Sequence, residues 1–396
     1  MIKKFLDLGK QPLANKYIPK NKFGQNETFY NLQVGFNNKT KLVSIINTVK
    51  SETMFDSKYP YRASMSKTMK KSFSILSKKI KKKINPSLIM EIGSNDGSFI
   101  RNFSKNKSIC VEPCRKPSLI TKKLGYKTYN DFWTIRLSKK IKSENKEIDL
   151  IYSANTLSHI KDLNSVFLAI EYTLSKKGVL ILEDPSLLEC LKKGSYDQFY
   201  NEHIYLFSII SLKNVLKKHG MEIFDIDKLD VHGGSLRYYI KKKRNNKFKI
   251  NKSVKIFTQK ELKFGLHKYV TYKNFGKKVE ESKRLLVKLM IGLKKNKHTI
   301  IGYGSTAKAT TILNYCKINN KIIDYFFDTT PDKVNKYMPG SKIFIKKYKK
   351  ALTNEASHVF LGAWNFKKEI FNKEKKFLKN GGKFITHVPY PKIISN

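Results

Sequence analysis

The sequence predicts an α/β protein with a doubly wound parallel sheet in the middle, an irregular N-terminal module before it and a Rossmann-like domain after it. Apolar runs alternate with helical patterns over residues 88–183 and again over 299–386, which is the rhythm of strand-helix-strand units. Each series opens with an apolar run and a glycine loop, at Gly93 and at Gly302. Such sheets bind their ligands at these loops.

We expect four parts along the chain. Residues 1–80 are rich in lysine and asparagine and show the least periodic pattern. Residues 246–296 are charged and helical in pattern, as in a connector between domains. The four parts are an N-terminal module with its lead-in helix (1–80), the doubly wound domain (81–245), the helical connector (246–296) and the Rossmann-like domain (297–396).

The formal net charge of +49 would suit a nucleic-acid-binding protein, but the type of basic residue argues against specific recognition. Only seven of the 80 basic residues are arginine, and base edges and phosphates are contacted preferentially by arginine. Lysine is instead spread through every segment. We therefore expect no specific nucleic-acid partner, whereas an acidic small-molecule substrate suits the charge.

The sequence predicts neither a membrane segment nor a metal centre. The stretch Met1–Gly9 lacks the apolar core of a secretory signal, and no later apolar run is long enough to span a bilayer. We expect a cytoplasmic protein with no membrane partner. The four cysteines include one close pair, Cys110 and Cys114, and no second pair, so no disulfide framework or zinc site is implied.

The first glycine loop is acidic, which favours a cationic ligand. Its residues are Glu91, Gly93, Ser94, Asn95, Asp96 and Gly97. Glycine lets a ligand approach the backbone, whereas the two carboxylates would repel a pyrophosphate. S-adenosylmethionine carries a sulfonium and an ammonium group and suits this loop better than NAD. An ordinary tight turn is the alternative.

Three later segments would complete an adenosine site. The next strand ends at Glu112 and Pro113, roughly 20 residues beyond the loop, where a carboxylate can accept from both ribose hydroxyls. Asp131 could hold the adenine amino group, and Phe132 could lie against the ring or equally pack in the core. Asn155 follows the fourth strand, at the edge where ligands bind.

The densest group of reactive side chains follows the last parallel strand. Tyr200, Glu202 and His203 fall within four positions, and a histidine beside a carboxylate is a plausible general base. His159 comes one helical turn after Asn155 and could face the same cleft, or could cap or pack. Nearer the N-terminus, a stretch rich in tyrosine and serine could line a polar pocket or form a surface turn.

Two further glycine turns carry polar residues. His232 and Arg237 flank a Gly-Gly turn into the final strand of the middle domain. In the last domain, Tyr303 lies within the second glycine loop and Lys308 follows it. Loop amides together with a lysine could face a phosphate, so this loop is a candidate nucleotide site.

These blocks resemble a known family. Almost end to end, the chain is similar to the S-adenosylmethionine-dependent sugar C-methyltransferases of deoxysugar biosynthesis. The stretches that carry the similarity are Asp7–Gly9, Pro12–Asn15, Glu91–Gly97, Asn155 with His159, Tyr200–Ser208, His232–Arg237, Gly302–Gly304 with Ala307 and Lys308, and Ala363–Asn365. The Glu-His block and the His-Gly-Gly-Ser-Leu-Arg block are far more specific than a glycine loop.

The resemblance implies a class I methyltransferase fold in the middle domain and methyl transfer to carbon of a nucleotide-linked 4-keto-deoxysugar. It implies that His203 is the base that forms an enolate. The residues implied around this base are Glu202, Tyr200, His159 and Tyr61. The residues expected to contact the nucleotide sugar are His232, Arg237, Tyr303 and Lys308.

The family's N-terminal module binds a structural zinc through cysteines, which this sequence lacks. The first cysteine pair would precede Met1, and the second is replaced around residues 34–38. Zinc is therefore not expected, and the rigidity of the module is open.

Two other functions remain open from the sequence. Methyl transfer to a sugar oxygen or nitrogen needs a base but no ketone. A non-catalytic relative that binds polyanions would suit the charge, although the intact Glu-His block argues against it. The sugar, the nucleotide and the oligomeric state are not predicted.

Overall fold

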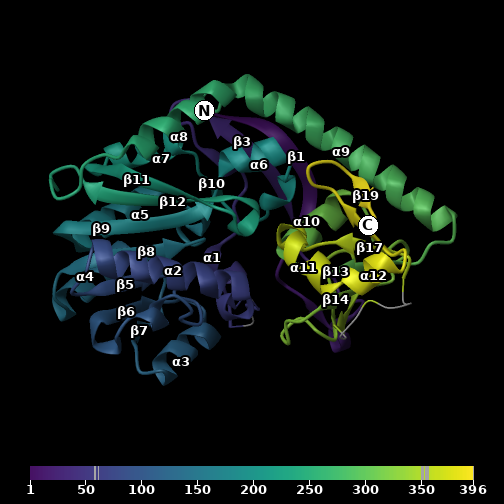
Figure 1. Ribbon diagram of the computed structural model, residues 1–396, viewed down its shortest axis with the longest axis horizontal. Helices are drawn as coiled ribbons and strands as arrows, with labels where there is room; N and C mark the ends of the chain where they lie inside the picture. Colours follow the sequence, from purple (N-terminus) through teal and green to yellow (C-terminus); the bar gives the residue numbers. More distant parts are fainter. Residues whose placement is uncertain (58, 61, 349–351, 353–355, 396) are drawn as a thin grey trace.

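The computed structural model describes residues 1–396 except 58, 61, 349–351, 353–355 and 396. Three β-sheets form the architecture (Figure 1). The central sheet has the strand order β11-β12-β9-β8-β5-β6-β7. Its strands are β5 (Ile89–Ile92), β6 (Ser108–Val111), β7 (Lys127–Tyr129), β8 (Ile148–Ala154), β9 (Leu174–Pro185), β11 (Met221–Leu229) and β12 (Ser235–Lys242).

The direction of the strands makes the central sheet doubly wound. β5 lies between β6 and β8 and is parallel to both, so the strand order reverses there and the carboxyl end of β5 is a switch point. β12 runs antiparallel to β9 and to β11. This arrangement confirms the predicted α/β class.

Helices cover both faces of the central sheet and give it two cores. One face packs against α4 (Ile135–Glu144), α5 (Leu163–Thr173) and α7 (Ile209–Lys217), and the other against α2 (Lys67–Lys83). Ser66 caps the N-terminus of α2, because its hydroxyl accepts from the backbone N–H of Met69. The shorter helices of this region are α1 (Ser51–Met54), α3 (Arg115–Lys123) and α6 (Leu187–Lys193).

The N-terminal region is more regular than the sequence predicts. β1 (Ile2–Pro12), β3 (Phe29–Asn37) and β4 (Val43–Ile45) form an antiparallel sheet, which β10 (Tyr205–Leu206) of the middle region extends. Its inward side chains, among them Leu6, Leu8 and Val34, are buried. The alternation is weak in the sequence because β1 has register shifts and both strands carry glycine and polar residues.

The C-terminal sheet has a parallel centre, as predicted, and antiparallel edges. Its order is β19-β18-β17-β13-β14-β16-β15-β2. The strands are β13 (Ile300–Tyr303), β14 (Tyr325–Asp328), β15 (Lys336–Tyr337), β16 (Phe344–Lys347), β17 (His358–Leu361), β18 (Lys383–Thr386), β19 (Lys392–Ile394) and, from the N-terminal region, β2 (Ile18–Pro19). Its helices are α10 (Ala307–Tyr315), α11 (Lys367–Lys373) and α12 (Lys375–Lys379).

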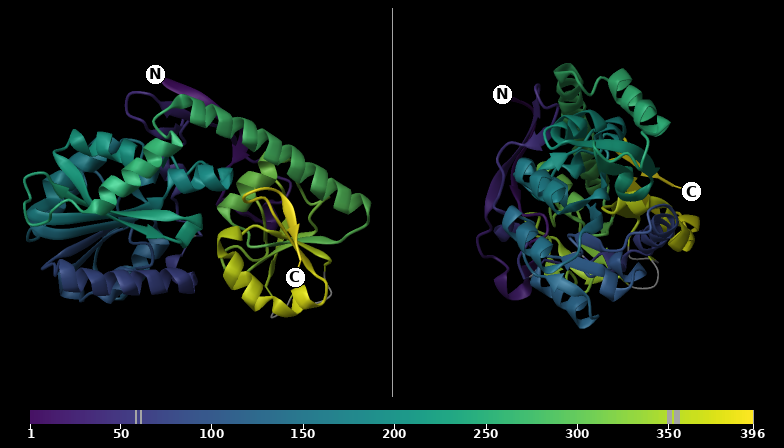
Figure 2. Two further views of the ribbon diagram at one scale, coloured as in Figure 1. Left: turned by 45° about the horizontal axis from the view of Figure 1, so that its top comes forward. Right: turned by 90° about the vertical axis from the view of Figure 1, so that its left-hand side faces the viewer.

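Two connector helices, α8 (Lys252–Phe264) and the long α9 (Tyr269–Lys295), join the central and C-terminal sheets. Figures 1 and 2 show α9 crossing from one to the other with the N-terminal strands beside it. Phe36 stacks on Tyr272 at 4.5 Å between ring centroids. Gly276 has no room for a side chain, because an added Cβ would lie 2.2 Å from the carbonyl oxygen of Phe5. Within the described part of the chain, no helix has the length and apolar character needed to cross a membrane.

Candidate active site

The first glycine loop follows β5 and is held by the carboxylate at the end of β6. Glu112 accepts from the backbone N–H of Asn95 at 2.7 Å and from that of Cys114 at 2.8 Å. Gly93 has φ of +74°, and an added Cβ would lie 2.1 Å from the Thr156 hydroxyl, so only glycine fits. These contacts fix the loop against the ends of β6 and β8.

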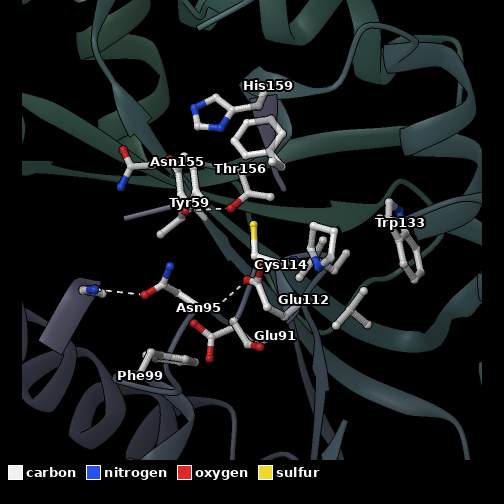
Figure 3. Close-up of a pocket in the computed structure, with 18 of the residues that line it drawn as sticks. Tyr59, Glu91, Asn95, Phe99, Glu112, Cys114, Trp133, Asn155, Thr156 and His159 are labelled. Atoms are coloured by element: carbon white, nitrogen blue, oxygen red, sulfur yellow. Dashed lines mark hydrogen bonds between the residues drawn. The ribbon is translucent and has the colours of Figure 1, made fainter. Parts of the chain in front are cut away.

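A cavity of 120 Å³, which we call the donor cavity, opens beside this loop. Of the residues predicted to bind the methyl donor, those that line it are Glu91, Gly93, Ser94, Asn95, Glu112, Pro113, Phe132 and Asn155. Figure 3 shows His159 on the side of the cavity away from Glu91 and Glu112. The structure therefore brings together most of the donor site expected from sequence.

Three predicted donor contacts do not line this cavity and are corrected. The Asp96 carboxylate turns back into the chain, where it accepts from the Ser64 backbone N–H at 3.2 Å and from the Ser98 hydroxyl at 2.6 Å. Gly97 shapes the turn with φ of +77°. Asp131 points outward and pairs with Arg136 at 3.4 Å. Sequence spacing gave the positions of these residues but not the direction of their side chains.

The donor cavity has an acidic wall. Burial raises the pKa of Glu91 well above its usual range, and the neighbouring Asp96 and Glu112 add to the increase. Burial also raises the pKa of Glu112. A positively charged ligand would relieve this repulsion. The carboxylates and the aromatic side chains of Phe99 and Phe132 on the same wall fit the charge and the adenine ring of S-adenosylmethionine.

A second cavity of 360 Å³, which we call the acceptor cavity, adjoins the donor cavity. Tyr59, Met69, Asn155 and His159 line both. The acceptor cavity draws on the N-terminal, middle and C-terminal regions, because its lining includes Asn15 of the N-terminal region and the second glycine loop of the C-terminal sheet. A ligand in one cavity therefore lies next to a ligand in the other.

His203 lines the acceptor cavity with a defined tautomer. Its Nδ1 lies 2.8 Å from the carbonyl oxygen of Gln198, which can only accept, so Nδ1 carries the proton of the neutral ring. Its Nε2 lies 2.5 Å from the Tyr200 hydroxyl and accepts from it. Burial, with His159 and Lys308 nearby, lowers the pKa of His203 well below its usual range. At neutral pH the ring is therefore uncharged, with its lone pair on Nε2.

An aromatic stack continues from His203 to the donor cavity. The His203 ring lies 5.1 Å from the ring of His159, which stacks on Phe55 at 5.6 Å. Burial lowers the pKa of His159 to about 4, and its Nε2 has no hydrogen-bond partner among the described residues. His159 is therefore placed as expected, at the wall between the two cavities.

Glu202 does not contact His203, although the two residues are adjacent in the sequence. Its two oxygens accept from the Asn15 amide at 2.8 Å and from the Tyr59 hydroxyl at 2.9 Å. Burial raises the pKa of Glu202 to about 7. The difference arises because consecutive side chains of the loop point apart, so that Glu202 reaches the N-terminal segments and His203 reaches the cavity.

Tyr59 and Asn15 are not among the site residues predicted from sequence, where Tyr61 is preferred to Tyr59. Tyr61, the tyrosine chosen from sequence, lies outside the described residues. Tyr59 lines both cavities and donates to Glu202. The signal for both residues was present in the sequence, in the Tyr-Pro-Tyr-Arg and Pro-Leu-Ala-Asn stretches, but their folding onto Glu202 depends on tertiary contacts.

Three of the four predicted substrate contacts line the acceptor cavity: His232, Tyr303 and Lys308. Arg237 does not. It is 4% exposed and pairs with Glu183 at 2.9 Å. Arg237 lies on β12 inside the sheet, where a buried cation needs a carboxylate partner. The prediction that it contacts the substrate is therefore corrected, and Arg237 has a structural role in the sheet. Lys333, which also lines the cavity, was not predicted.

Comparisons with known proteins show what the chain is similar to. Three family models match successive parts of the chain, namely a zinc binding domain (1–55), a methyltransferase domain (61–226) and a "C-methyltransferase C-terminal domain" (230–389). The "C-methyltransferase NovU" of Streptomyces niveus is 27% identical over 396 residues, covering 98% of this chain and 94% of the relative.

Solved structures overlap with part of the chain. A methyltransferase from Clostridium acetobutylicum is 17% identical, with a TM-score of 0.34, over 45% of this chain and 93% of its own. The magnesium protoporphyrin IX methyltransferase of Synechocystis is 9% identical, with a TM-score of 0.32, over 43% and 78%. The fold assignment rests on the strand order described above.

The residues present do not fit the zinc of the matching N-terminal model. Residues 1–55 contain no cysteine and no histidine, which are the usual ligands of structural zinc. In the described ranges, no three histidine, cysteine, aspartate or glutamate residues are grouped as a metal site would require. The apolar contacts of β1 and β3 with α9 hold this module instead.

Proposed function

We propose that this S-adenosylmethionine-dependent methyltransferase transfers the methyl group to carbon, and that its acceptor is a nucleotide-linked 4-keto-deoxysugar. The observation that carries the proposal is the wall shared by the two cavities, with a neutral imidazole on the acceptor side. A base in that position can act on a carbon held next to the donor. Methylation of carbon needs such a base, because a C–H bond beside a ketone must lose its proton first.

The donor cavity supplies the electrophile when it is filled. S-adenosylmethionine carries a methyl group on a positively charged sulfur. Glu91 and Glu112 offer negative charge to the bound molecule, and Phe132 offers an apolar surface. Tyr59, Asn155 and His159 line both cavities and so border the place where the bound donor would meet the acceptor.

His203 is the proposed base. Its Nε2 takes the proton from the carbon beside the ketone, and the electron pair of the C–H bond moves into the enolate. The Tyr200 hydroxyl, which donates to Nε2 in the structure, turns its proton to the developing enolate oxygen. The protonated Nε2 then donates to the Tyr200 oxygen, so one hydrogen bond is exchanged for another.

Two neighbours support this exchange. The Gln198 carbonyl accepts from Nδ1 and stabilises the positive charge that the His203 ring acquires. His159 presents an unpartnered Nε2 at the shared wall and is placed to donate to the same oxygen if that nitrogen carries the proton. Glu202 holds Tyr59 in this wall rather than orienting His203.

The rest of the acceptor cavity suits a nucleoside diphosphate. Four basic side chains line it, Arg62, Lys308, Lys333 and Lys373, against two acidic ones, Asp328 and Glu369. The N-terminus of α10 lies in its wall, where backbone N–H groups favour phosphate. Aromatic side chains on the same wall offer surfaces for a base, and these are Tyr303, Phe327, Tyr348 and Phe366.

The test is incubation with S-adenosylmethionine and a nucleoside-diphosphate-linked 4-keto-6-deoxysugar. We expect a product heavier by one CH₂, with NMR showing the new methyl on a ring carbon beside the ketone. A methyl on oxygen or nitrogen would contradict C-methylation. Absence of any methyl transfer at saturating concentrations of both would contradict the proposed acceptor class.

A further inference from the structure

A buried cluster outside the cavities joins the C-terminal sheet to the middle region. Asp197 lies in the 3₁₀ turn Tyr196–Gln198, after α6, and is fully buried. Its Oδ2 accepts from the Trp364 indole N–H at 2.5 Å and lies 3.1 Å from Nε2 of His387. Trp364 and His387 come from loops after β17 and β18. One oxygen of the Asp197 carboxylate is therefore contacted by two side chains from a distant part of the chain.

This cluster is coupled by charge as well as by hydrogen bonds. Burial alone would raise the pKa of Asp197, but His387 and Lys308 hold it below its usual range. The Lys308 ammonium lies 5.3 Å from the centre of the Trp364 ring and donates to the His232 carbonyl at 3.3 Å. Asp197 is thus a buried anion. Of its partners, Lys308 lines the acceptor cavity, and Trp364 lies between Ala363 and Asn365, which also line it.

The residue after Asp197 supports the base directly. Gln198 accepts from Nδ1 of His203 through its carbonyl, and its side-chain amide donates to the His232 carbonyl at 2.7 Å. Trp364 also closes on Gly233, where an added Cβ would lie 2.5 Å from the indole ring. The turn that contains Asp197 therefore holds two backbone carbonyl groups in place. One is the Gln198 carbonyl, which accepts from His203, and the other is the His232 carbonyl, which accepts from the Gln198 amide.

The same loop reaches the acceptor. Ala363, Asn365 and Phe366 line the acceptor cavity on either side of Trp364. A substrate that contacts this loop thus touches the segment that anchors Asp197. A connection from the acceptor cavity through Trp364 to Asp197 would not be needed if the C-terminal sheet only enclosed the nucleotide.

We propose that Asp197, Trp364 and His387 are positioning residues that let the C-terminal sheet hold His203 in its reactive tautomer and orientation. They act through the Gln198 carbonyl and contact neither donor nor acceptor. Trp364 supplies the geometry, because its indole N–H donates to the Asp197 carboxylate while its ring packs against Gly233. The role of these three residues in orienting His203 rests on the proposed function of His203 as the base.

The test compares Trp364→Phe, which removes the indole N–H donor together with part of the ring, with Asp197→Ala and the conservative Asp197→Asn. We expect kcat per donor-binding site to fall by about 100-fold in Asp197→Ala, since misplacement of about 1 Å has that effect. Trp364→Phe should lose about 10-fold. Asp197→Asn, which keeps an acceptor for Trp364, should recover part of the loss. The KM for the acceptor should change less than kcat.

The control is Ile345→Val on β16, a buried position three strands from β17. It weakens the C-terminal core without touching Asp197. A purely structural role for the cluster would lower thermal stability in all variants and leave kcat per donor-binding site unchanged. That result would overturn the proposal.

A second measurement does not depend on the substrate. Nitrogen-15 NMR of histidine-labelled protein, with the His203 signal identified by its loss in His203→Gln, reports which ring nitrogen carries the proton. We expect protonated Nδ1 in the wild type and in Ile345→Val, and a mixture of tautomers in Trp364→Phe and Asp197→Ala. An unchanged His203 tautomer in Trp364→Phe and Asp197→Ala would overturn the proposed positioning role, even if the acceptor proved to be of another class. Failure of methyl transfer in the wild type would bear only on the acceptor class.

Discussion

The donor and acceptor cavities share a wall but are built in different ways. The donor cavity is formed mainly by loops after β5, β6 and β8, and its charged lining residues are the carboxylates Glu91 and Glu112. The acceptor cavity draws on the N-terminal, middle and C-terminal regions and has more basic than acidic residues. The acidic lining of the donor cavity suits a cationic donor, and the mainly basic charged lining of the acceptor cavity suits the anionic acceptor proposed above.

This difference predicts separable effects of substitution. Changes in the donor cavity should alter donor affinity and leave proton removal intact. Changes in the acceptor cavity should do the reverse. A variant that changed donor affinity and proton removal equally would contradict this division of roles between the two cavities.

The largest expected effect is on the acceptor side. His203→Ala removes the proposed base, and we expect kcat to fall by about 10³-fold, within the usual contribution of a general base. Donor affinity measured by calorimetry should stay within about twofold, because His203 does not line the donor cavity. His219→Gln, a histidine just after the end of α7 whose ring lies near that of Phe167, is the control. Turnover close to wild type in His203→Ala would remove this residue from the role.

The second prediction concerns Arg237, which the structure assigns to neither cavity. Arg237→Met leaves the fully buried Glu183 without its cation, and we expect the free energy of unfolding in urea to fall by about 3 kcal/mol. The KM for the acceptor should not change in the folded fraction. Combined substitution of Glu183→Leu should restore much of the stability. A selective increase of KM would return Arg237 to the substrate site.

The third prediction tests the donor side. Glu112→Ala frees the backbone of Asn95 and Cys114, and we expect the dissociation constant for S-adenosylmethionine to rise by about 10-fold, since two hydrogen bonds to a charged group are lost. The matched control is Asp131→Ala, a carboxylate that does not line the cavity. Equal affinity in both variants would count against the donor site as described.

The smallest expected effect is a pH shift at the shared wall. Tyr59 donates to Glu202, whose pKa burial raises to about 7. Tyr59→Phe removes a donor that favours the charged carboxylate, so the pKa of Glu202 should rise further. We expect the midpoint of any limb near pH 7 in the kcat profile to move upward by less than about one unit. A downward shift of this midpoint would contradict the expected effect of Tyr59 on the pKa of Glu202.

The same contrast explains what the sequence could predict. The donor site follows from local pattern, because residues at the ends of parallel strands meet at one edge. Glu91, Glu112 and Asn155 were found in this way. Asp96 and Asp131 have the right spacing, but a turn residue can point into its own loop or into solvent, and spacing does not distinguish these.

The acceptor site depends on contacts between distant segments. Glu202 meets Asn15, 187 positions away, and Asp197 meets Trp364, 167 positions away. Neither pair has a periodic or local signal. The N-terminal sheet was also hidden, because its inward residues are covered by α9 rather than by a neighbouring βα unit. The family resemblance supplied His203, and only the fold shows what orients it.

The most direct test of the account is exchange of the acceptor's own proton. The wild-type protein is incubated in deuterated water with the 4-keto sugar nucleotide and S-adenosylhomocysteine, which fills the donor cavity but has no methyl group to give. NMR should show deuterium entering at the carbon beside the ketone with wild type and not with His203→Ala. Equal exchange with both proteins would contradict His203 as the base at the wall between the two cavities.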